Sequence, residues 1–236
     1  MSREPRYSVL FAFPLLALYE LLAFALSQST LHGVRNGADV LLKTAFVAFG
    51  GARGLAVFTV LLVGVGVWLV LRDRRRNPAP LGVAVFGAML AESVVWALLL
   101  GGVVSWLTGL LLHPPLAQVA GTEPATLSLG AQLVVSLGAG LYEELLFRVL
   151  LVGGLAAGGL ALGWKRPVAI GVAVLLSAVI FSGFHYVGPL GDPWALDSFT
   201  FRAIAGLVLS GLYVTRGFGI VAWSHALYDV LVSLAV

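Results

Sequence analysis

The 236-residue chain has no cysteine, and charged residues make up only 11% of it. The absence of thiols excludes disulfides, thiolate catalysis and cysteine-ligated zinc. Soluble domains have roughly 25% charged residues, so this chain lacks the polar surface of a water-soluble enzyme, a nucleic-acid-binding protein or a disordered chain. The net charge of +3 is small, and the basic residues cluster where they suit membrane orientation better than phosphate binding.

Long apolar segments take the place of that polar surface, since 60% of the residues are apolar or aromatic. A bilayer core about 30 Å thick needs roughly 20 apolar residues in a helix. We therefore predict an all-α, polytopic transmembrane helix bundle with about seven spans, in a range of roughly six to eight. The expected spans are 8–27, 54–71, 81–112, 127–163, 167–186, 199–215 and 217–235, with 38–50 as a candidate interfacial helix.

Two of the expected spans are longer than a bilayer requires. Residues 81–112 contain the pair Gly101-Gly102, where we expect the helix to break. Residues 127–163 would reach about 55 Å as one straight helix. Their several glycines are the expected places for a bend or a break.

Basic residues set the expected orientation. The strongest basic run is 72–76, and the positive-inside rule places it in the cytoplasm. Two spans precede this run, so the N-terminus is also expected there. The segment 113–126 carries no Lys or Arg and is expected outside. We find no pattern of a cleaved signal peptide, and we expect a multi-pass protein of a bacterial or archaeal plasma membrane.

Ionisable residues inside apolar segments are the main functional signal. A charge at the bilayer centre costs about 2.5–3.5 kcal/mol on insertion scales, and such residues usually face a protein interior or a water-filled cavity. Glu20 and Glu92 are expected to hydrogen-bond within the bundle. Six further residues form three short clusters in the C-terminal half, and these are Glu143, Glu144, Arg148, His185, His225 and Asp229.

Helical spacing suggests partners within these clusters. Glu144 and Arg148 are four residues apart and share a helix face, so they can form an ion pair. Glu143 points about 100° away from Glu144 and is left free for chemistry. His225 and Asp229 also share a face. The alternative interpretation is a buried charge network or a hydrogen bond that only packs helices.

Chain lengths predict that the clusters meet. The polar break at Lys165 marks a turn at a membrane surface. On straight helices, Glu143 lies about 33 Å before this turn and His185 about 30 Å after it, so both reach a similar depth. The next turn, near Arg216, sends the third cluster back across the bilayer. We expect all three clusters in the membrane half away from Lys165.

Such a constellation suits hydrolysis. Glu143 can act as a general base on water, while His185, His225 and Asp229 polarise a scissile carbonyl or stabilise its oxyanion. Alternatively, Glu143, His185 and His225 can hold Zn²⁺ with an open position for water. The residues leave a metal-bound and a metal-free water equally open.

The three motifs resemble those of a known family. Glu143-Glu144-x-x-x-Arg148, Phe181-x-x-x-His185 and His225-x-x-x-Asp229 look like the motifs of the CPBP family. This is the CAAX protease and bacteriocin-processing family of intramembrane endopeptidases, also described as type II CAAX prenyl endopeptidase-like or lysostaphin-resistance-like. The order, the internal spacing and the placement on apolar helices all fit over residues 127–236.

The resemblance implies a role for each matching residue. Glu143 would activate the water, with Glu144 and Arg148 in support. His185, His225 and Asp229 would stabilise the oxyanion or bind a metal, Asp229 being the acidic variant of a position that the family fills with Asn or Asp. Residues 127–236 would then form the catalytic core with about four spans, behind an N-terminal transmembrane segment, 1–126, with about three.

The resemblance also implies the partners. The substrate would be a membrane-associated or lipidated peptide or protein within the lipid bilayer, and no nucleic acid is expected.

Counting basic residues places Lys165 on the cytoplasmic side, so the site would open outwards. Cytosolic CAAX processing requires the opposite orientation. Two other functions remain as alternatives: a proton- or cation-coupled transporter, and a catalytically silent scaffold or immunity protein.

Overall fold

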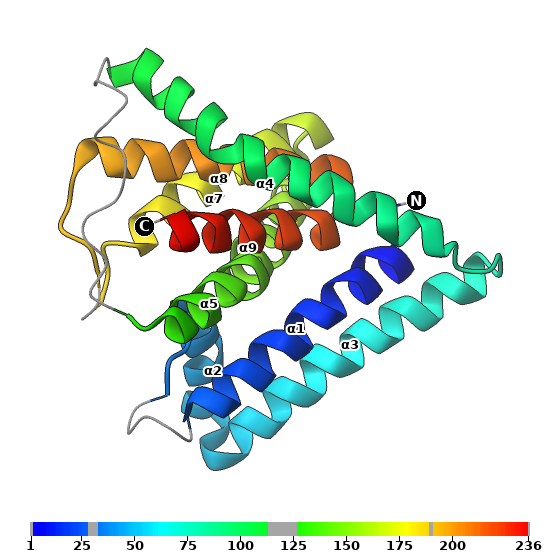
Figure 1. Ribbon diagram of the computed structural model, residues 1–236. Helices are drawn as coiled ribbons and strands as arrows, with labels where there is room; N and C mark the ends of the chain where they lie inside the picture. Colours follow the sequence, from blue (N-terminus) through cyan, green and yellow to red (C-terminus); the bar gives the residue numbers. More distant parts are fainter. Residues whose placement is uncertain (1, 28–32, 113–126, 189–190, 236) are drawn as a thin grey trace.

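The computed structural model describes residues 2–27, 33–112, 127–188 and 191–235 (Figure 1). Within these ranges the regular structure is all helical, and seven helical stretches are long and apolar enough to cross a membrane. This confirms the predicted fold class; the expected outside segment, 113–126, is not among the described residues. The elements are α1 (Pro5–Ser27), α2 (Gly37–Gly50), η1 (Gly51–Arg53), α3 (Gly54–Arg76), α4 (Val83–Leu112), α5 (Leu129–Gly138), η3 (Ala139–Val152), α6 (Gly153–Ala161), α7 (Arg166–Phe184), α8 (Leu196–Arg216) and α9 (Phe218–Ala235).

The last helix, α9, is the centre of the bundle. It packs against α1, α4, α5, η3 and α8, and Figure 1 shows it in red between α4 and α5. Its Ile220 and Val221 are fully buried. A side chain at Gly219 would place its Cβ 2.6 Å from the carbonyl oxygen of Ser8, so glycine allows α1 to approach α9. Close approach through small residues is a main source of helix association in membranes.

The expected break at Gly101-Gly102 is wrong, because α4 is continuous from Val83 to Leu112. Gly101 instead faces α9. A Cβ at this position would lie 2.9 Å from the ring of Tyr228. The glycine makes room for an aromatic side chain of the neighbouring helix and does not interrupt the backbone.

The long segment after residue 127 is one unbroken helical run made of α5, η3 and α6. Its middle section, η3, is a π-helix of 14 residues. A π-helix bonds residue i to residue i+5 and is rare beyond a single turn; it often marks a functional site. Its wider coil advances less per residue than an α-helix, which shortens a segment that would be too long for the bilayer. All of Glu143, Glu144 and Arg148 lie on η3.

Most of the basic residues lie at one end of the bundle. The backbone N–H of Arg6 donates to Asp73, and its guanidinium donates to the carbonyl oxygen of Asn77 at 2.6 Å. The start of α1 is therefore fixed to the end of α3. The residues before α1 also lie beside the turn between α8 and α9, because a Cβ at Gly217 would lie 3.1 Å from Cα of Arg3. Since α7 and α8 run antiparallel, Arg166 and Arg216 share this end. The start of α2 and the end of α7 lie at the other end, where a Cβ at Gly37 would lie 3.5 Å from the ring of Phe184.

Candidate active site

The site is built around a buried carboxylate, Glu144. Both Glu144 and its helical neighbour Arg148 are fully buried, and Nη1 of Arg148 lies 3.1 Å from Oε1 of Glu144. This is a close charge contact without the alignment of a hydrogen bond, so it confirms the expected pair as an electrostatic one. The guanidinium also lies 4.4 Å from the ring centre of Phe181 on α7, in cation–π geometry.

His225 on α9 lies between two carboxylates. Its Nδ1 is 2.7 Å from Oε1 of Glu144, and its Nε2 is 3.5 Å from Oδ2 of Asp229. Glycine brings the two helices together: a Cβ at Gly140 would lie 2.3 Å from the carbonyl oxygen of Ala222. The shared helix face of His225 and Asp229 is confirmed, and their motif is joined to the Glu144 motif.

Glu143 is buried and has a partner that the sequence analysis missed. Its carboxylate Oε1 accepts a 2.9 Å hydrogen bond from the side-chain amide of Asn36, at the start of α2. Its electrostatic neighbours include His185 and His225, which come from two other parts of the chain. Glu143 is therefore the point where η3, α2, α7 and α9 meet.

His185 caps the end of α7 beside this carboxylate. Its Nδ1 is 2.9 Å from the carbonyl oxygen of Phe181. A carbonyl can only accept, so Nδ1 carries the hydrogen and the neutral ring presents Nε2 as an acceptor. Burial lowers the pKa of His185; nearby Glu143 opposes this shift and Arg202 adds to it. The neutral imidazole is thus the form expected at pH 7.

A polar network joins Tyr142, the neighbour of Glu143 on η3, to α1 and α2. The Tyr142 hydroxyl donates to Oε1 of Glu20 at 2.7 Å, and Lys43 donates to the same oxygen at 3.0 Å. The expected hydrogen bonding of Glu20 within the bundle is confirmed. Glu92 also has a partner, since it accepts two hydrogen bonds from Arg216 at the basic end, far from the site.

Sequence reasoning had one available signal for Asn36. An Asn directly before an apolar helical segment is a typical N-cap, and Asn36 does cap α2 by accepting from the backbone N–H of Ala38. The cap says where α2 begins. It says nothing of the contact with Glu143, which lies 107 residues further along the chain.

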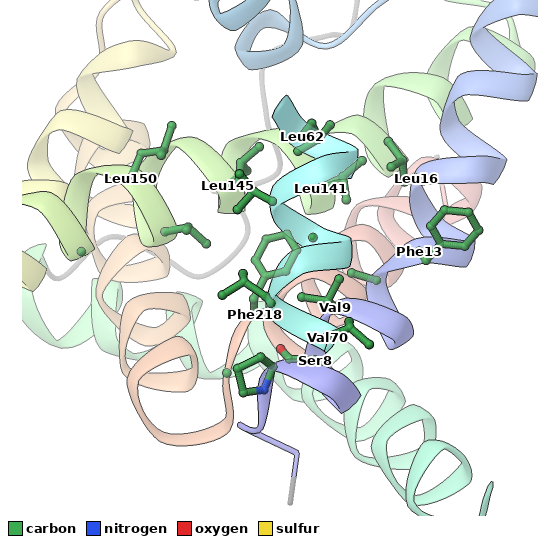
Figure 2. Close-up of a pocket in the computed structure, with 18 of the residues that line it drawn as sticks. Ser8, Val9, Phe13, Leu16, Leu62, Val70, Leu141, Leu145, Leu150 and Phe218 are labelled. Atoms are coloured by element: carbon green, nitrogen blue, oxygen red, sulfur yellow. The ribbon is translucent and has the colours of Figure 1, made fainter. Parts of the chain in front are cut away.

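An apolar groove of about 870 Å³ runs along the other side of η3. Figure 2 shows Leu141 and Leu145 of η3 facing Leu16 of α1 and Leu62 of α3 across it. Its lining among the described residues includes neither Glu143 nor Glu144. η3 therefore presents an apolar face to the groove, while its carboxylates point into the bundle.

Zinc binding by Glu143, His185 and His225 stays a prediction. Among the described residues, no group of three or more His, Asp or Glu side chains is arranged to hold a metal ion. Nδ1 of His225 is taken up by Glu144, and Oε1 of Glu143 is taken up by Asn36. We therefore derive no reaction step through a metal.

The fold and this buried carboxylate–histidine cluster define a polytopic membrane protein with a polar site among its helices. Residues 125–231 match the family model described as type II CAAX prenyl endopeptidase Rce1-like. Over this region the chain is similar to that family of CAAX proteases, and its apolar helices make it a multi-pass membrane protein. No curated protein and no solved structure matches the chain.

Proposed function

We propose that this protein is an intramembrane endopeptidase that hydrolyses a peptide bond in a membrane-associated or lipidated peptide. The observation that carries the proposal is the placement of Glu143. It is a buried carboxylate held by one oxygen, with His185 and His225 among its electrostatic neighbours. A carboxylate in such surroundings, in a family of CAAX proteases, is suited to activate water.

The proposed reaction uses the chain's own residues. Glu143 takes a proton from water, and the resulting hydroxide attacks the scissile carbonyl carbon. Glu143 then passes this proton to the leaving amine as the carbon–nitrogen bond breaks. General acid–base catalysis of this kind contributes about 10²- to 10⁴-fold to a rate.

His225 is proposed to stabilise the negative charge that develops on the carbonyl oxygen. Nδ1 of His225 is engaged by Glu144, so Nε2, which lies near Asp229, is the atom left to contact substrate. In its protonated form, His225 donates from Nε2 to the oxyanion. Nε2 of His185 is also left open, because Nδ1 donates to Phe181. In the neutral ring this atom is an acceptor, so His185 is proposed to orient the attacking water by accepting one of its hydrogens.

Charge distribution supports an orientation for the site. Most of the basic residues lie at one end of the bundle, which contains the start of α1, the end of α3, the start of α7 and the turn after α8. By the positive-inside rule, this end is cytoplasmic. We therefore propose that the site lies in the non-cytoplasmic half of a bacterial or archaeal plasma membrane. It would then receive peptide from that side.

The experiment compares peptide N- and C-termini in membranes from cells that carry wild type, Glu143→Gln or Glu92→Gln. Glu92 is the matched control, a span carboxylate that pairs with Arg216 away from the site. New termini in the wild type and the control, but not in Glu143→Gln, are expected. Identical termini in all three, with folded protein in each, would contradict proteolysis and favour transport or scaffolding.

Metal dependence is tested on the same substrate. Purified protein is treated with a chelator and then assayed on a peptide that spans the identified cleavage site. Full activity after chelation supports the glutamate-activated water without metal. Loss that is restored by added Zn²⁺ would instead support the zinc prediction.

A further inference from the structure

We infer that Asn36 is a positioning residue for Glu143, supplied by a part of the chain outside the matched residues 125–231. This inference rests on the proposed function, because it assigns Asn36 the task of orienting the general base. Its basis is a buried side-chain contact between the start of α2 and η3.

The orientation of the Asn36 amide follows from its two partners. Its Oδ1 accepts from the backbone N–H of Ala38 at 2.8 Å, which an amide nitrogen cannot do. The nitrogen must therefore face Oε1 of Glu143, where it donates at 2.9 Å. The Asn36 side chain thus caps the start of α2 and also orients the Glu143 carboxylate.

Asn36 is itself held firmly. Its backbone N–H donates to the hydroxyl of Tyr19, and this hydroxyl donates in turn to Oδ2 of Asp39 at 2.7 Å. Asp39 is fully buried and contacts both Arg35 and Lys43, at 2.9 and 2.7 Å. Because these contacts join α1 to α2, the donor amide is fixed before any substrate arrives.

A glycine makes the approach of Asn36 possible. Gly138 is the last residue of α5, five positions before Glu143. A Cβ at Gly138 would lie 2.5 Å from Cβ of Asn36 and 2.7 Å from the ring of Tyr19. Any larger residue would push Asn36 away from the helix that carries the carboxylate. This contact is independent of the hydrogen bond and points to the same close fit.

The chemical consequence concerns which oxygen is available. With Oε1 held by the amide, the second oxygen, Oε2, is the one left to accept a proton from water. Loss of the donor frees the carboxylate to rotate. Since a misplacement of about 1 Å can cost roughly 10²-fold in rate, we expect kcat to fall by about 10- to 100-fold with KM little changed.

The test uses Asn36→Ser in the full-length protein. Serine still caps a helix, but it is too short to cap α2 and donate to Glu143 at once. The matched control is Asn77→Ser, the same change at an exposed position. Both are assayed on a peptide spanning the cleavage site found by the terminus comparison, with kcat, KM and thermal unfolding measured for each.

A tenfold or greater loss of kcat in Asn36→Ser, with KM and unfolding temperature close to the control, is the expected result. Wild-type kcat in the folded variant would overturn the inference. If Asn36→Ser unfolds, Asn36→Asp decides the matter, because aspartate keeps the length and the cap but has no amide donor. Wild-type kcat per folded molecule in Asn36→Asp would also overturn it.

The outcomes separate this inference from the function on which it rests. If wild type and Glu143→Gln do not differ on any peptide, the proposed protease activity fails. If only Glu143→Gln loses activity while both Asn36 variants retain it, the activity stands. Asn36 is then a helix cap and nothing more.

Discussion

Nδ1 of His225 lies 2.7 Å from Oε1 of Glu144, a residue 81 positions earlier in the chain. The same oxygen lies 3.1 Å from Nη1 of Arg148. One carboxylate oxygen therefore serves a cation on its own helix and an imidazole on the central helix. Glu144 is the residue that joins the first sequence motif to the third.

Replacement of Glu144 should lower stability strongly. Glu144→Gln leaves the buried guanidinium of Arg148 without its counter-charge, and breaking a buried pair costs about 3–5 kcal/mol. The control Glu92→Gln breaks a pair with the half-exposed Arg216, which is worth about 1 kcal/mol or less. Denaturation of both variants in detergent measures the difference, and equal losses would contradict the structural role given to Glu144.

Adding a single methyl group at Gly140 should separate η3 from α9. The new Cβ would lie 2.3 Å from the carbonyl oxygen of Ala222, and overpacking of this kind costs about 1–3 kcal/mol. Gly140→Ala should therefore lose both stability and activity. Gly154→Ala on α6 is the control, because the Cβ that alanine would add meets no other described segment within 4 Å. Similar behaviour of the two variants in unfolding and cleavage assays would refute the close approach.

Acid should destabilise the protein partly through His185. Burial lowers its pKa below the ordinary 6.5, so the unfolded chain takes up the proton more readily than the folded one. This loss in the free energy of unfolding is absent above pH 6.5 and grows as the pH falls towards the lowered pKa. Unfolding temperatures at pH 7.5 and 5.0 should therefore differ less in His185→Gln than in wild type. An unchanged difference would show that other groups carry the whole effect.

The orientation can be tested cleanly because the chain has no cysteine of its own. Asn77→Cys lies at the basic end, and Val187→Cys lies two residues after His185 at the opposite end. A membrane-impermeant maleimide should label only Val187→Cys in intact cells and both variants in permeabilised cells. Labelling of Asn77→Cys alone in intact cells would reverse the orientation and place the site on the cytosolic side.

Local patterns predicted much of this molecule. Hydropathy found the spans because each depends on a continuous run of apolar residues. Helical spacing found the contacts of Glu144 with Arg148 and of His225 with Asp229 because these partners lie one turn apart. The proposed roles of the site residues remain predictions.

Features that depend on contacts between distant segments escaped the same reasoning. Gly101 suggested a break, but this glycine instead makes room for the ring of Tyr228 on another helix. The π-helical form of η3 has no periodic signature in its sequence. Its Phe147 carbonyl accepts a hydrogen bond from Ser177 on α7, a partner that spacing along one helix cannot reveal.

The position of α9 has a consequence for biosynthesis. Asn36 precedes α2, Glu143 lies on η3 and His225 lies on α9, so the three residues are synthesised in this order. A nascent chain therefore holds no complete site at any earlier stage. Because α9 also fills the centre of the bundle, the proposed site is complete only once this helix has packed, and a translation product truncated before α9 would lack the site.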